Sequence, residues 1–330
     1  MDNENNKPKD DADDASRRDF IKKAGLVAAS GVALASLPGV VRAAEGSEGD
    51  TTDKPLKGRT ALITGAARGI GLAMAMKLAQ QGANIALLDI ASPNALQGII
   101  SYPLSSRQDL EQATALVKKQ GVGAIPLIAD VRNRAQMLES INNAVQTFGG
   151  LDIVIANAGI SNGAGFENEN ETIFKEIMNV NVAGVANTVH PAIAHLKKSK
   201  YGGRVIAISS VAGRRGVAEL ASYSASKWAV IGLMKSLSLD LGRYKITANA
   251  IAPTAVKTVM WQGEDTDNPI KNISNTAMDL LVKSYHSLPT GSIHPEEIAN
   301  AAAFLASDNA HYISGITLDV NAGWSGQMTG

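Results

Sequence analysis

The sequence contains no cysteine, and this absence removes several kinds of chemistry. Disulfides, thiolate metal sites and cysteine nucleophiles are all excluded. A chain without thiols also suits an oxidising compartment, where a stray thiol is a liability. The five histidines show no metal-ligand spacing, so we expect no metal site.

The chain also lacks an excess of charge of either sign. It has 31 basic and 31 acidic residues, and its formal net charge at pH 7 is zero. This balance gives no electrostatic reason to expect a nucleic-acid partner. Hydrophobic residues, in contrast, make up 45% of the 330 residues. That content indicates a globular protein with a sizeable core, in one large or two modest domains.

The N-terminal segment differs in composition from the rest of the chain. Residues 1–15 are polar and acidic, and we expect them to be disordered. The motif Ser16-Arg17-Arg18-Asp19-Phe20-Ile21-Lys22 follows, and a weakly apolar run spans residues 24–41. This order is typical of a twin-arginine (Tat) export signal. We therefore predict a signal peptide over residues 1–43 and a flexible leader over residues 44–57.

The signal predicts that the Tat export machinery is a partner and that the mature protein is periplasmic. An uncleaved membrane anchor stays open as an alternative, because the apolar run is about long enough to span a bilayer. Its richness in Gly, Ala and Ser makes the gain from burial in lipid small. Cleavage after Ala43 is therefore the prediction we favour.

A glycine-rich turn, Thr64-Gly65-Ala66-Ala67-Arg68-Gly69-Ile70-Gly71, is the first motif that carries chemistry. It joins a short apolar run to a stretch rich in Ala and Leu, which predicts a strand, a turn and a helix. Glycines allow a sharp turn and a close approach of the backbone to a ligand. The free N–H groups of the first helical turn favour a phosphate. We expect Gly65, Arg68, Gly69 and Ile70 to bind a nucleotide cofactor.

From Gly58 onward, predicted strands and helices alternate. The expected strands are Thr60–Thr64, Asn84–Asp89, Ala124–Ala129, Ile153–Ala156, Arg204–Ser209, Thr247–Ala252 and Ile316–Val320. The expected helices are Ile70–Gln81, Gln108–Gln120, Arg134–Phe148, Thr172–Lys198, Ser222–Gly242 and Pro295–Ser307. Repeated strand–helix–strand order predicts an α/β fold, with a doubly wound parallel sheet covered by helices on both faces. The prediction is one Rossmann-type domain over residues 58–330.

Two connections between these elements are unusually long, and long ordered excursions are usually functional. Residues 91–106 form an insertion after the second strand. Residues 254–294 are predicted to form a lid over the substrate, and they include Met260 and Trp261. These two apolar side chains suggest a mainly apolar substrate, such as an alicyclic alcohol.

Asp89 ends the second predicted strand, downstream of the glycine turn. A carboxylate at this place can accept hydrogen bonds from the adenosine ribose hydroxyls, and it would repel a 2′-phosphate. NAD is therefore favoured over NADP as the cofactor.

Tyr223 and Lys227 lie four residues apart at the start of a predicted helix, so they share one face. An ammonium beside a phenol favours the phenolate, and we expect Lys227 to lower the pKa of Tyr223 toward neutrality. Such a tyrosine can exchange a proton with an alcohol or carbonyl oxygen. Ser210, just past a strand end, is placed to bond the same oxygen.

These motifs, taken in order, resemble the classical short-chain dehydrogenase/reductase (SDR) family. The resemblance rests on the glycine turn, Asp130-Val131, Asn157-Ala158-Gly159, Asn181-Val182-Ala183-Gly184, Ser210 and the Tyr223–Lys227 segment. It covers residues 57–324, and it implies a seven-stranded parallel sheet in one domain. It also implies that Tyr223 is the general acid/base and that Lys227 lowers its pKa while holding the nicotinamide ribose.

The resemblance implies further roles. Ser210 would orient the substrate oxygen, and Asn181 would hold a water that links Lys227 to solvent. Asp130 and Val131 would contact the adenine, and the Asn157-Ala158-Gly159 motif would line the cofactor cleft. After the sixth strand the family usually has P-G-x-V-x-T. Here Thr254 replaces the glycine, whereas Pro253, Val256 and Thr258 remain to meet the nicotinamide.

The insertion and the P-T-x-V-x-T-x-M sequence together resemble a narrower branch, the carveol-dehydrogenase-like enzymes associated with mycofactocin. Members of that branch hold NAD without exchanging it, which implies non-exchangeable NAD here and a redox partner that recycles it. The family also implies a homotetramer built on two-fold axes. We therefore predict an NAD-dependent oxidoreductase that interconverts a secondary alcohol and its ketone.

Two other interpretations of the sequence were weighed. A non-catalytic NAD-binding sensor would share the glycine turn, but such proteins often lose the tyrosine or the lysine. A sugar-modifying dehydratase or epimerase of the extended relatives would carry the turn T-G-x-x-G-x-x-G, which this chain lacks. The sensor is thus the alternative that stays open.

Overall fold

The computed structural model describes residues 54–262 and 275–327. The predicted signal peptide and most of the leader lie outside the described residues. Residues 54–57 were expected to belong to the flexible leader, but they are packed against the domain. Leu56 is fully buried, and its backbone N–H donates to the carbonyl of Gln81 over 2.8 Å. The folded unit therefore begins at Lys54, earlier than predicted.

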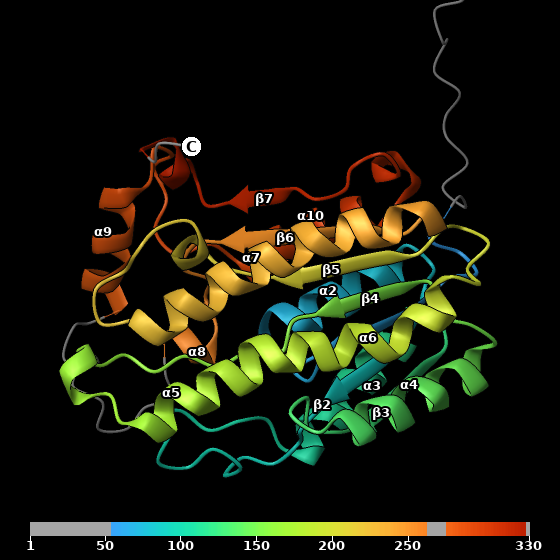
Figure 1. Cartoon of the computed structure of the whole chain (residues 1–330), viewed down its shortest axis with the longest axis horizontal. Coiled ribbons are helices and arrows are strands. Elements are labelled where there is room, and N and C mark those ends of the chain that lie inside the picture. Colours follow the sequence, from blue (N-terminus) through green and yellow to red (C-terminus); the bar gives the residue numbers. More distant parts are fainter. Residues whose placement is uncertain (1–53, 263–274, 328–330) are drawn as a thin grey trace, which may run out of the picture. The chain divides into compact units, whose positions relative to one another are not determined.

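The described residues form the expected α/β fold around one seven-stranded parallel sheet, in the order β3-β2-β1-β4-β5-β6-β7 (Figure 1). The strands are β1 (Thr60–Thr64), β2 (Asn84–Asp89), β3 (Ala124–Ile128), β4 (Ile153–Ala156), β5 (Arg204–Ile208), β6 (Thr247–Pro253) and β7 (Thr317–Val320). The strand order reverses between β1 and β4, where a doubly wound sheet leaves a crevice at its carboxyl edge.

The main helices are α2 (Gly69–Gln80), α3 (Arg107–Lys118), α4 (Arg134–Phe148), α5 (Glu171–Met178), α6 (Gly184–Leu196), α7 (Ala221–Leu241) and α10 (Pro295–Ala306). Two short helices, α8 (Val259–Gln262) and α9 (Asn275–Tyr285), lie in the predicted lid, where the sequence pattern had indicated no helix. None of the described helices is long and apolar enough to cross a membrane.

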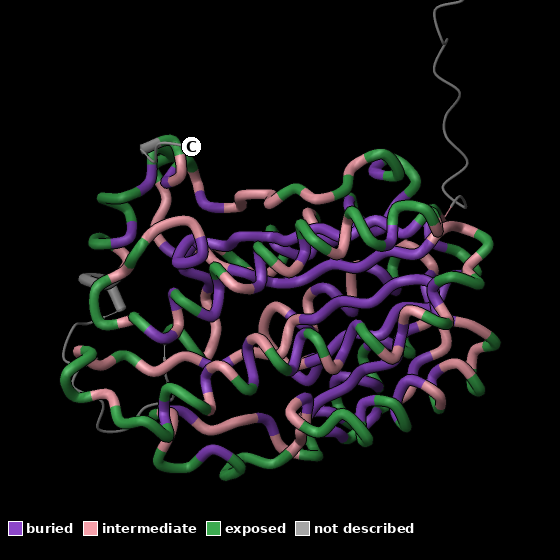
Figure 2. The backbone as a smooth tube through the Cα atoms, in the orientation of Figure 1, coloured by how far each residue is buried: buried purple, intermediate pink, exposed green. Residues whose placement is uncertain are grey.

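The core consists of two clusters, one on each face of the sheet. Side chains alternate along each strand, so Ala61 and Ile63 pack with α2, α3 and α10, whereas Leu62 packs with α4, α6 and α7. Figure 2 shows the continuous buried sheet between its exposed helix surfaces. Strands buried on both faces explain why their sequences are unbroken apolar runs.

The single helix predicted over residues 172–198 is interrupted. A π-turn, η2 (Asn179–Ala183), separates α5 from α6 and contains the buried Asn181. Here the N–H of Gly184 bonds to the carbonyl of Asn179, five residues back. A π-turn inserts an extra residue into a helix and frequently marks a functional site.

The free edge of β3 contains a proline, Pro126, in register with Leu87 of β2. The N–H of Ala129 donates to the carbonyl of Asp89, so residues of β3 at odd positions face β2. Pro126 therefore faces the open side of this edge strand, where its missing N–H removes no bond within the sheet.

Candidate active site

A cavity of about 1240 Å³ opens at the carboxyl edge of the sheet. The glycine turn, which follows β1, lines it, and so do Ser210, which follows β5, and Tyr223 and Lys227. Every residue that the sequence analysis assigned to the cofactor or the substrate lines this cavity, including Asp130, Val131, Pro253, Val256, Thr258, Met260 and Trp261. A cavity of this volume exceeds the usual size for one small ligand and suits a dinucleotide with a substrate.

The glycine turn has the backbone shape that a phosphate site needs. Gly65 and Gly69 adopt positive φ angles of 65° and 57°, a region that favours glycine. A Cβ atom at Gly71 would collide with the carbonyl oxygen of Gly65, so the start of α2 packs directly against the turn. Because α2 begins at Gly69, its first free N–H groups lie at the cavity, where they favour an anion.

The Asn157-Ala158-Gly159 motif, after β4, fixes the glycine turn from its neighbour strand. The amide of Asn157 donates to the carbonyls of Thr64 and Gly65 over 2.9 and 3.1 Å. In return, the Thr64 hydroxyl accepts from the backbone N–H groups of Asn157 and Ala158, both over 3.0 Å. Asn157 thus contributes to a cofactor site by holding the turn.

Asp89 is 5% exposed at the end of β2, and protein donors hold its carboxylate in place. Ala67 N donates to Oδ2 over 3.1 Å, and Ala91 N donates to Oδ1 over 3.2 Å. The Ser105 hydroxyl, from the insertion, also donates to Oδ1, over 2.5 Å. Two carboxylate oxygens offer about four acceptor positions, so capacity for a ribose hydroxyl remains.

Asp130 also lines the cavity, but its carboxylate is engaged by a neighbour. Arg132 forms an ion pair with Asp130 over 2.5 Å and a second one with Glu176 of α5. The sequence motif indicated that Asp130 lies near the adenine end, yet it did not indicate that an arginine neutralises it. The adjacent Val131 is 7% exposed and belongs to the core cluster.

Ser210, Tyr223 and Lys227 converge in the same cavity. Ser210 follows β5, and its hydroxyl forms a hydrogen bond with the Tyr223 side chain. Lys227 Nζ lies 5.5 Å from the centre of the Tyr223 ring and donates to the carbonyl of Ile208 over 2.9 Å. A Cβ atom at Gly159 would lie 3.3 Å from Lys227 Nζ, so a larger residue there would crowd the ammonium.

Burial has the largest effect on the pKa values of Lys227 and Tyr223. Burial lowers the pKa of Lys227 from 10.5 to about 8. Burial also raises the pKa of Tyr223, and the hydrogen bond from Ser210 only partly opposes that rise. The expectation that Lys227 brings the pKa of Tyr223 toward neutrality is therefore wrong for the protein's own groups, because desolvation of the phenolate is the larger effect.

Asn181 is fully buried, and its side chain is used by the protein itself. Its amide exchanges two hydrogen bonds with the backbone of Ile160, over 2.8 and 2.9 Å. It also donates to the hydroxyl of Ser226 over 3.0 Å, and Ser226 lies next to Lys227 on α7. Asn181 therefore positions the π-turn against the catalytic helix.

The lid is fastened to the site through the residue that departs from the family pattern. Thr254 Oγ1 hydrogen-bonds to Nε2 of the buried His286 over 2.7 Å. Nδ1 of His286 lies 2.9 Å from the carbonyl of Thr290 and donates to it. Met260 and Trp261 are 39% and 37% exposed, and the Trp261 indole donates to Ser292 Oγ over 3.1 Å. Met278 lies in α9, but its side chain is outside the described part.

Sequence analysis missed the residues by which the insertion crosses the cleft. Tyr102 is 9% exposed, and its hydroxyl accepts from the backbone N–H of Ser161 over 3.0 Å. The Asn162 amide donates to the carbonyl of Ile99 over 2.8 Å, and Arg68 donates to the carbonyl of Pro103. Only the three-dimensional path of the insertion reveals these contacts.

Trp324 of the C-terminal segment also lines the cavity and stacks on Tyr285, with the ring centres 4.8 Å apart.

Over residues 54–262 and 275–327, no group of three His, Asp or Glu side chains is arranged to hold a metal ion. Ser210, Tyr223 and Lys227 line the same cavity as the glycine turn, so a ligand bound at the turn can reach these three polar side chains.

Comparisons with known proteins agree with this geometry. A family model described as enoyl-(acyl carrier protein) reductase matches residues 65–325. The (−)-trans-carveol dehydrogenase of Rhodococcus erythropolis is 36% identical over 273 residues, which cover 81% of this chain and 98% of that protein. The crystal structure of carveol dehydrogenase from Mycobacterium avium, in complex with NAD, has a TM-score of 0.77. It is 32% identical and covers 82% of this chain and 98% of that one.

The crystal structure of levodione reductase is also similar, with a TM-score of 0.72 and 28% identity. It covers 82% of this chain and 99% of its own. The match to the family model, the relatives and the shared fold lead to one assignment. The chain belongs to the short-chain dehydrogenase/reductase family of oxidoreductases.

Proposed function

We propose that this protein is an NAD-dependent dehydrogenase that interconverts a secondary alcohol and its ketone. The observation that carries the proposal is the convergence of Ser210, Tyr223 and Lys227 in the same cavity as the glycine turn. A protein that only senses NAD would not need this polar array, and the similar carveol dehydrogenase and levodione reductase are named as enzymes.

The residues present fit NAD. The N–H groups at the start of α2 suit its pyrophosphate, and Asp89 suits the adenosine ribose. Val131 lies at the adenine end, and Val256 and Thr258 lie where the family meets the nicotinamide. Thr258 packs against the turn, since a Cβ atom at Gly69 would lie 3.3 Å from its methyl group. Bound NAD⁺ supplies a hydride acceptor and a positive charge near Tyr223 and Lys227.

The side chains supply proton transfer and orientation. In the direction of oxidation, Tyr223 Oη accepts the proton of the alcohol while Ser210 Oγ hydrogen-bonds to the same alcohol oxygen. The Lys227 ammonium, held by the carbonyl of Ile208, stabilises the phenolate that precedes this step. In the direction of reduction, Tyr223 donates the proton to the ketone oxygen.

We propose that NAD is not exchanged and that the insertion, residues 91–106, is the reason. Tyr102, Ile99, Pro103 and Ser105 each make a hydrogen bond across the cleft, and those bonds reach both sides of the cofactor site. Leu96 is buried in the core below, so the insertion is anchored at its centre as well. NAD release would require several of these contacts to break together.

The test is to purify the protein without added nucleotide, dialyse it, denature it and measure the NAD released. We expect one NAD per chain. We also expect the bound nicotinamide absorbance to change when an alicyclic alcohol is added. Empty protein that turns over only with added NAD would contradict non-exchange and leave the dehydrogenase assignment intact. No alcohol-dependent change with either form would contradict the enzyme assignment.

The substrate that we propose is mainly apolar, such as a terpenoid or alicyclic alcohol. Met260, Trp261 and Trp324 supply apolar surface to the cavity. Lid closure over this surface would exclude water from the reacting oxygen. Replacement of Trp261 by Ala should raise KM for bulky alicyclic alcohols more than for small ones.

Three further proposals concern where and with what the protein works. The motif at residues 16–22 supports Tat export and a periplasmic location, and the Tat route carries folded proteins, so NAD would be bound before export. Outside the cytoplasm, a redox partner or second substrate would recycle the bound NAD.

A homotetramer is supported by exposed apolar side chains on α7 and α10, such as Trp228, Leu239 and Phe304. Sedimentation of the purified protein tests that assembly.

A further inference from the structure

The amino edge of the sheet, opposite the cavity, is strongly basic. Two segments on one half of this edge, before β1 and after α3, expose Lys57, Lys118 and Lys119. Two loops on the other half expose Lys197, Lys198, Lys200, Arg243 and Lys245. Among the described residues of these loops and of the helix ends next to them, the acidic residues are Asp152, which is buried, Asp240 and Asp308. The chain as a whole is neutral, so the remaining parts carry a matching excess of acidic residues.

These loops form one continuous surface, which we call the basic edge. Lys54 Nζ donates to the carbonyl of Gln120 over 3.5 Å, which joins the start of the domain to the loop after α3. The Arg59 guanidinium lies 4.6 Å from the centre of the Tyr201 ring, which joins the same start to the loop before β5. A Cβ atom at Gly202 would lie 2.7 Å from the carbonyl of Lys245, so the loops before β5 and β6 touch.

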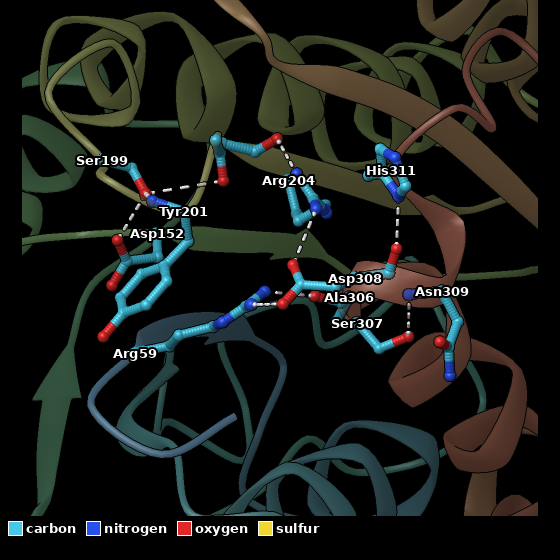
Figure 3. Close-up of polar contacts among 12 residues, drawn as sticks. Arg59, Asp152, Ser199, Tyr201, Arg204, Ala306, Ser307, Asp308, Asn309 and His311 are labelled. Carbon is cyan, nitrogen blue, oxygen red and sulfur yellow. Dashed lines mark hydrogen bonds and ion pairs between the residues drawn. The ribbon is translucent and has the colours of Figure 1, made fainter. Parts of the chain in front are cut away.

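The centre of the basic edge is held by a compact ion cluster (Figure 3). Arg59 and Arg204 have side chains that are 3% and 2% exposed, and both approach the carboxylate of Asp308, over 2.6 and 3.5 Å. Asp308 is the one acidic residue of the loop before β7, and its carboxylate is paired with these two arginines. Among the described residues, none of the exposed lysines of the basic edge forms an ion pair with an acidic side chain.

Lysine at a helix carboxyl end also complements the helix dipole, which explains part of the pattern at Lys118 and Lys197. It does not explain Lys57, Lys200 and Lys245, which lie in loops beyond the helices. The dipole also gives no reason for tyrosines, yet Tyr201, Tyr244 and Tyr312 all lie on this edge, and Tyr312 is 92% exposed. Lysine mixed with tyrosine is the composition found at membrane interfaces.

We propose that the basic edge binds the surface of an anionic phospholipid bilayer. The chain enters the folded domain at this same edge, at Lys54. A neutral protein with its basic charge on one edge orients that edge toward a negatively charged plane. The residues that line the cavity follow the carboxyl ends of the strands, at the opposite edge of the sheet, so the substrate cleft stays open in the bound protein.

The test uses the full chain and two kinds of vesicle, one of phosphatidylcholine alone and one of phosphatidylcholine mixed with phosphatidylglycerol. The apolar run can bind both, so the measured quantity is the ratio of the two partition coefficients. The variant K197E/K198E/K200E should lower this ratio by at least about a hundredfold, because each of the three basic residues near an anionic surface contributes roughly a fivefold factor. High salt should lower the ratio for the wild-type chain in the same direction.

The matched control is R107E/K175E/K283E, which makes the same change in net charge at exposed basic residues away from the basic edge. It should leave the ratio within about threefold of wild type. An equal fall in both triple variants, or no fall in the first, would overturn the proposal. Binding of double-stranded DNA as tight as binding of the anionic vesicles would also overturn it. If K197E/K198E/K200E does not fold, K197Q/K198Q/K200Q serves instead, with a smaller fall in the ratio expected.

Discussion

The two edges of the sheet use buried polar groups in opposite ways. At the carboxyl edge, Lys227 is buried and Tyr223 is partly buried, and both have few protein partners. Burial lowers the pKa of Lys227 and raises that of Tyr223, so it favours the neutral form of each. At the amino edge, the buried Arg59 and Arg204 share the carboxylate of Asp308. The first arrangement leaves groups available to a ligand. The second pairs its buried charges within the protein, although Nε and Nη2 of Arg204 have no hydrogen-bond partner among the described residues.

The difference indicates which edge keeps polar groups for function at the expense of the free energy of unfolding. Uncompensated polar groups destabilise a protein, and functional sites are where such groups persist. Mutations at the carboxyl edge should therefore change activity more than stability, and mutations at the amino edge should do the reverse. The predictions that follow test this contrast in order of expected effect.

Replacement of Tyr223 by Phe should lower kcat by a factor of roughly 10² to 10⁴, because the proton donor and acceptor is lost. The variant should unfold at the same temperature as the wild type or a higher one, since a buried hydroxyl is removed. Steady-state kinetics and thermal unfolding check the two halves of this prediction. Undiminished turnover would exclude Tyr223 as the acid/base.

Replacement of Asp308 by Asn should lower the free energy of unfolding by about 2 kcal/mol. It leaves two buried guanidiniums without their counter-charge, and the figure is discounted because the Asp308 side chain is 70% exposed. Turnover per folded molecule should stay unchanged. Asp240→Asn is the matched control at the same edge, and urea unfolding of both variants gives the comparison. A loss of activity without a loss of stability would contradict the expectation that mutations at the amino edge change stability more than activity.

Lys227 should make stability rise with pH. Its pKa is about 8 in the folded protein, against an ordinary value of 10.5 for a lysine. Between these values the unfolded chain binds more protons, so raising the pH favours the folded state. The gain should be about 2 kcal/mol from pH 8 to pH 10. Urea unfolding at several pH values should show this slope in the wild type and not in Lys227→Met.

Replacement of Tyr102 by Phe should give the smallest of these effects. It removes the acceptor for Ser161 N–H and should speed NAD dissociation by about tenfold, the value of one hydrogen bond. The exposed Tyr312 offers a control, because Tyr312→Phe changes the same atom far from the insertion. Equal dissociation rates in both variants would show that the Tyr102 bond does not restrain NAD.

The strands and most helices could be predicted from sequence because each is a local pattern. Strands buried on both faces read as apolar runs, and β1, β2 and β4 lie where the pattern indicated. The π-turn at Asn179–Ala183 could not be predicted in this way, because one extra residue in a helix leaves no mark in composition. The helix α9 was missed because it lies in a long connection without a strong period.

The site residues also divide into those that sequence motifs predicted and those that depend on the three-dimensional path of the chain. The motifs indicated that Asp89, Ser210, Tyr223 and Lys227 share one cavity, since parallel strands bring their carboxyl ends together. The direction of the pKa change at Tyr223 was not predictable, because spacing reveals a neighbouring lysine but does not reveal burial. The bond from Ser161 to Tyr102 joins residues from different loops, so it depends on the path of the insertion.

Pro126 has a consequence for how copies of this chain can join. An edge strand normally offers a row of free N–H groups onto which another strand can be added. At β3 the proline interrupts that row, so this side of the sheet does not offer a complete row of donors to an added strand. The other margin, β7, contains no proline and is only half buried along its length. Extension of the sheet by a second molecule is therefore directional: it can proceed past Val320 but not past Pro126.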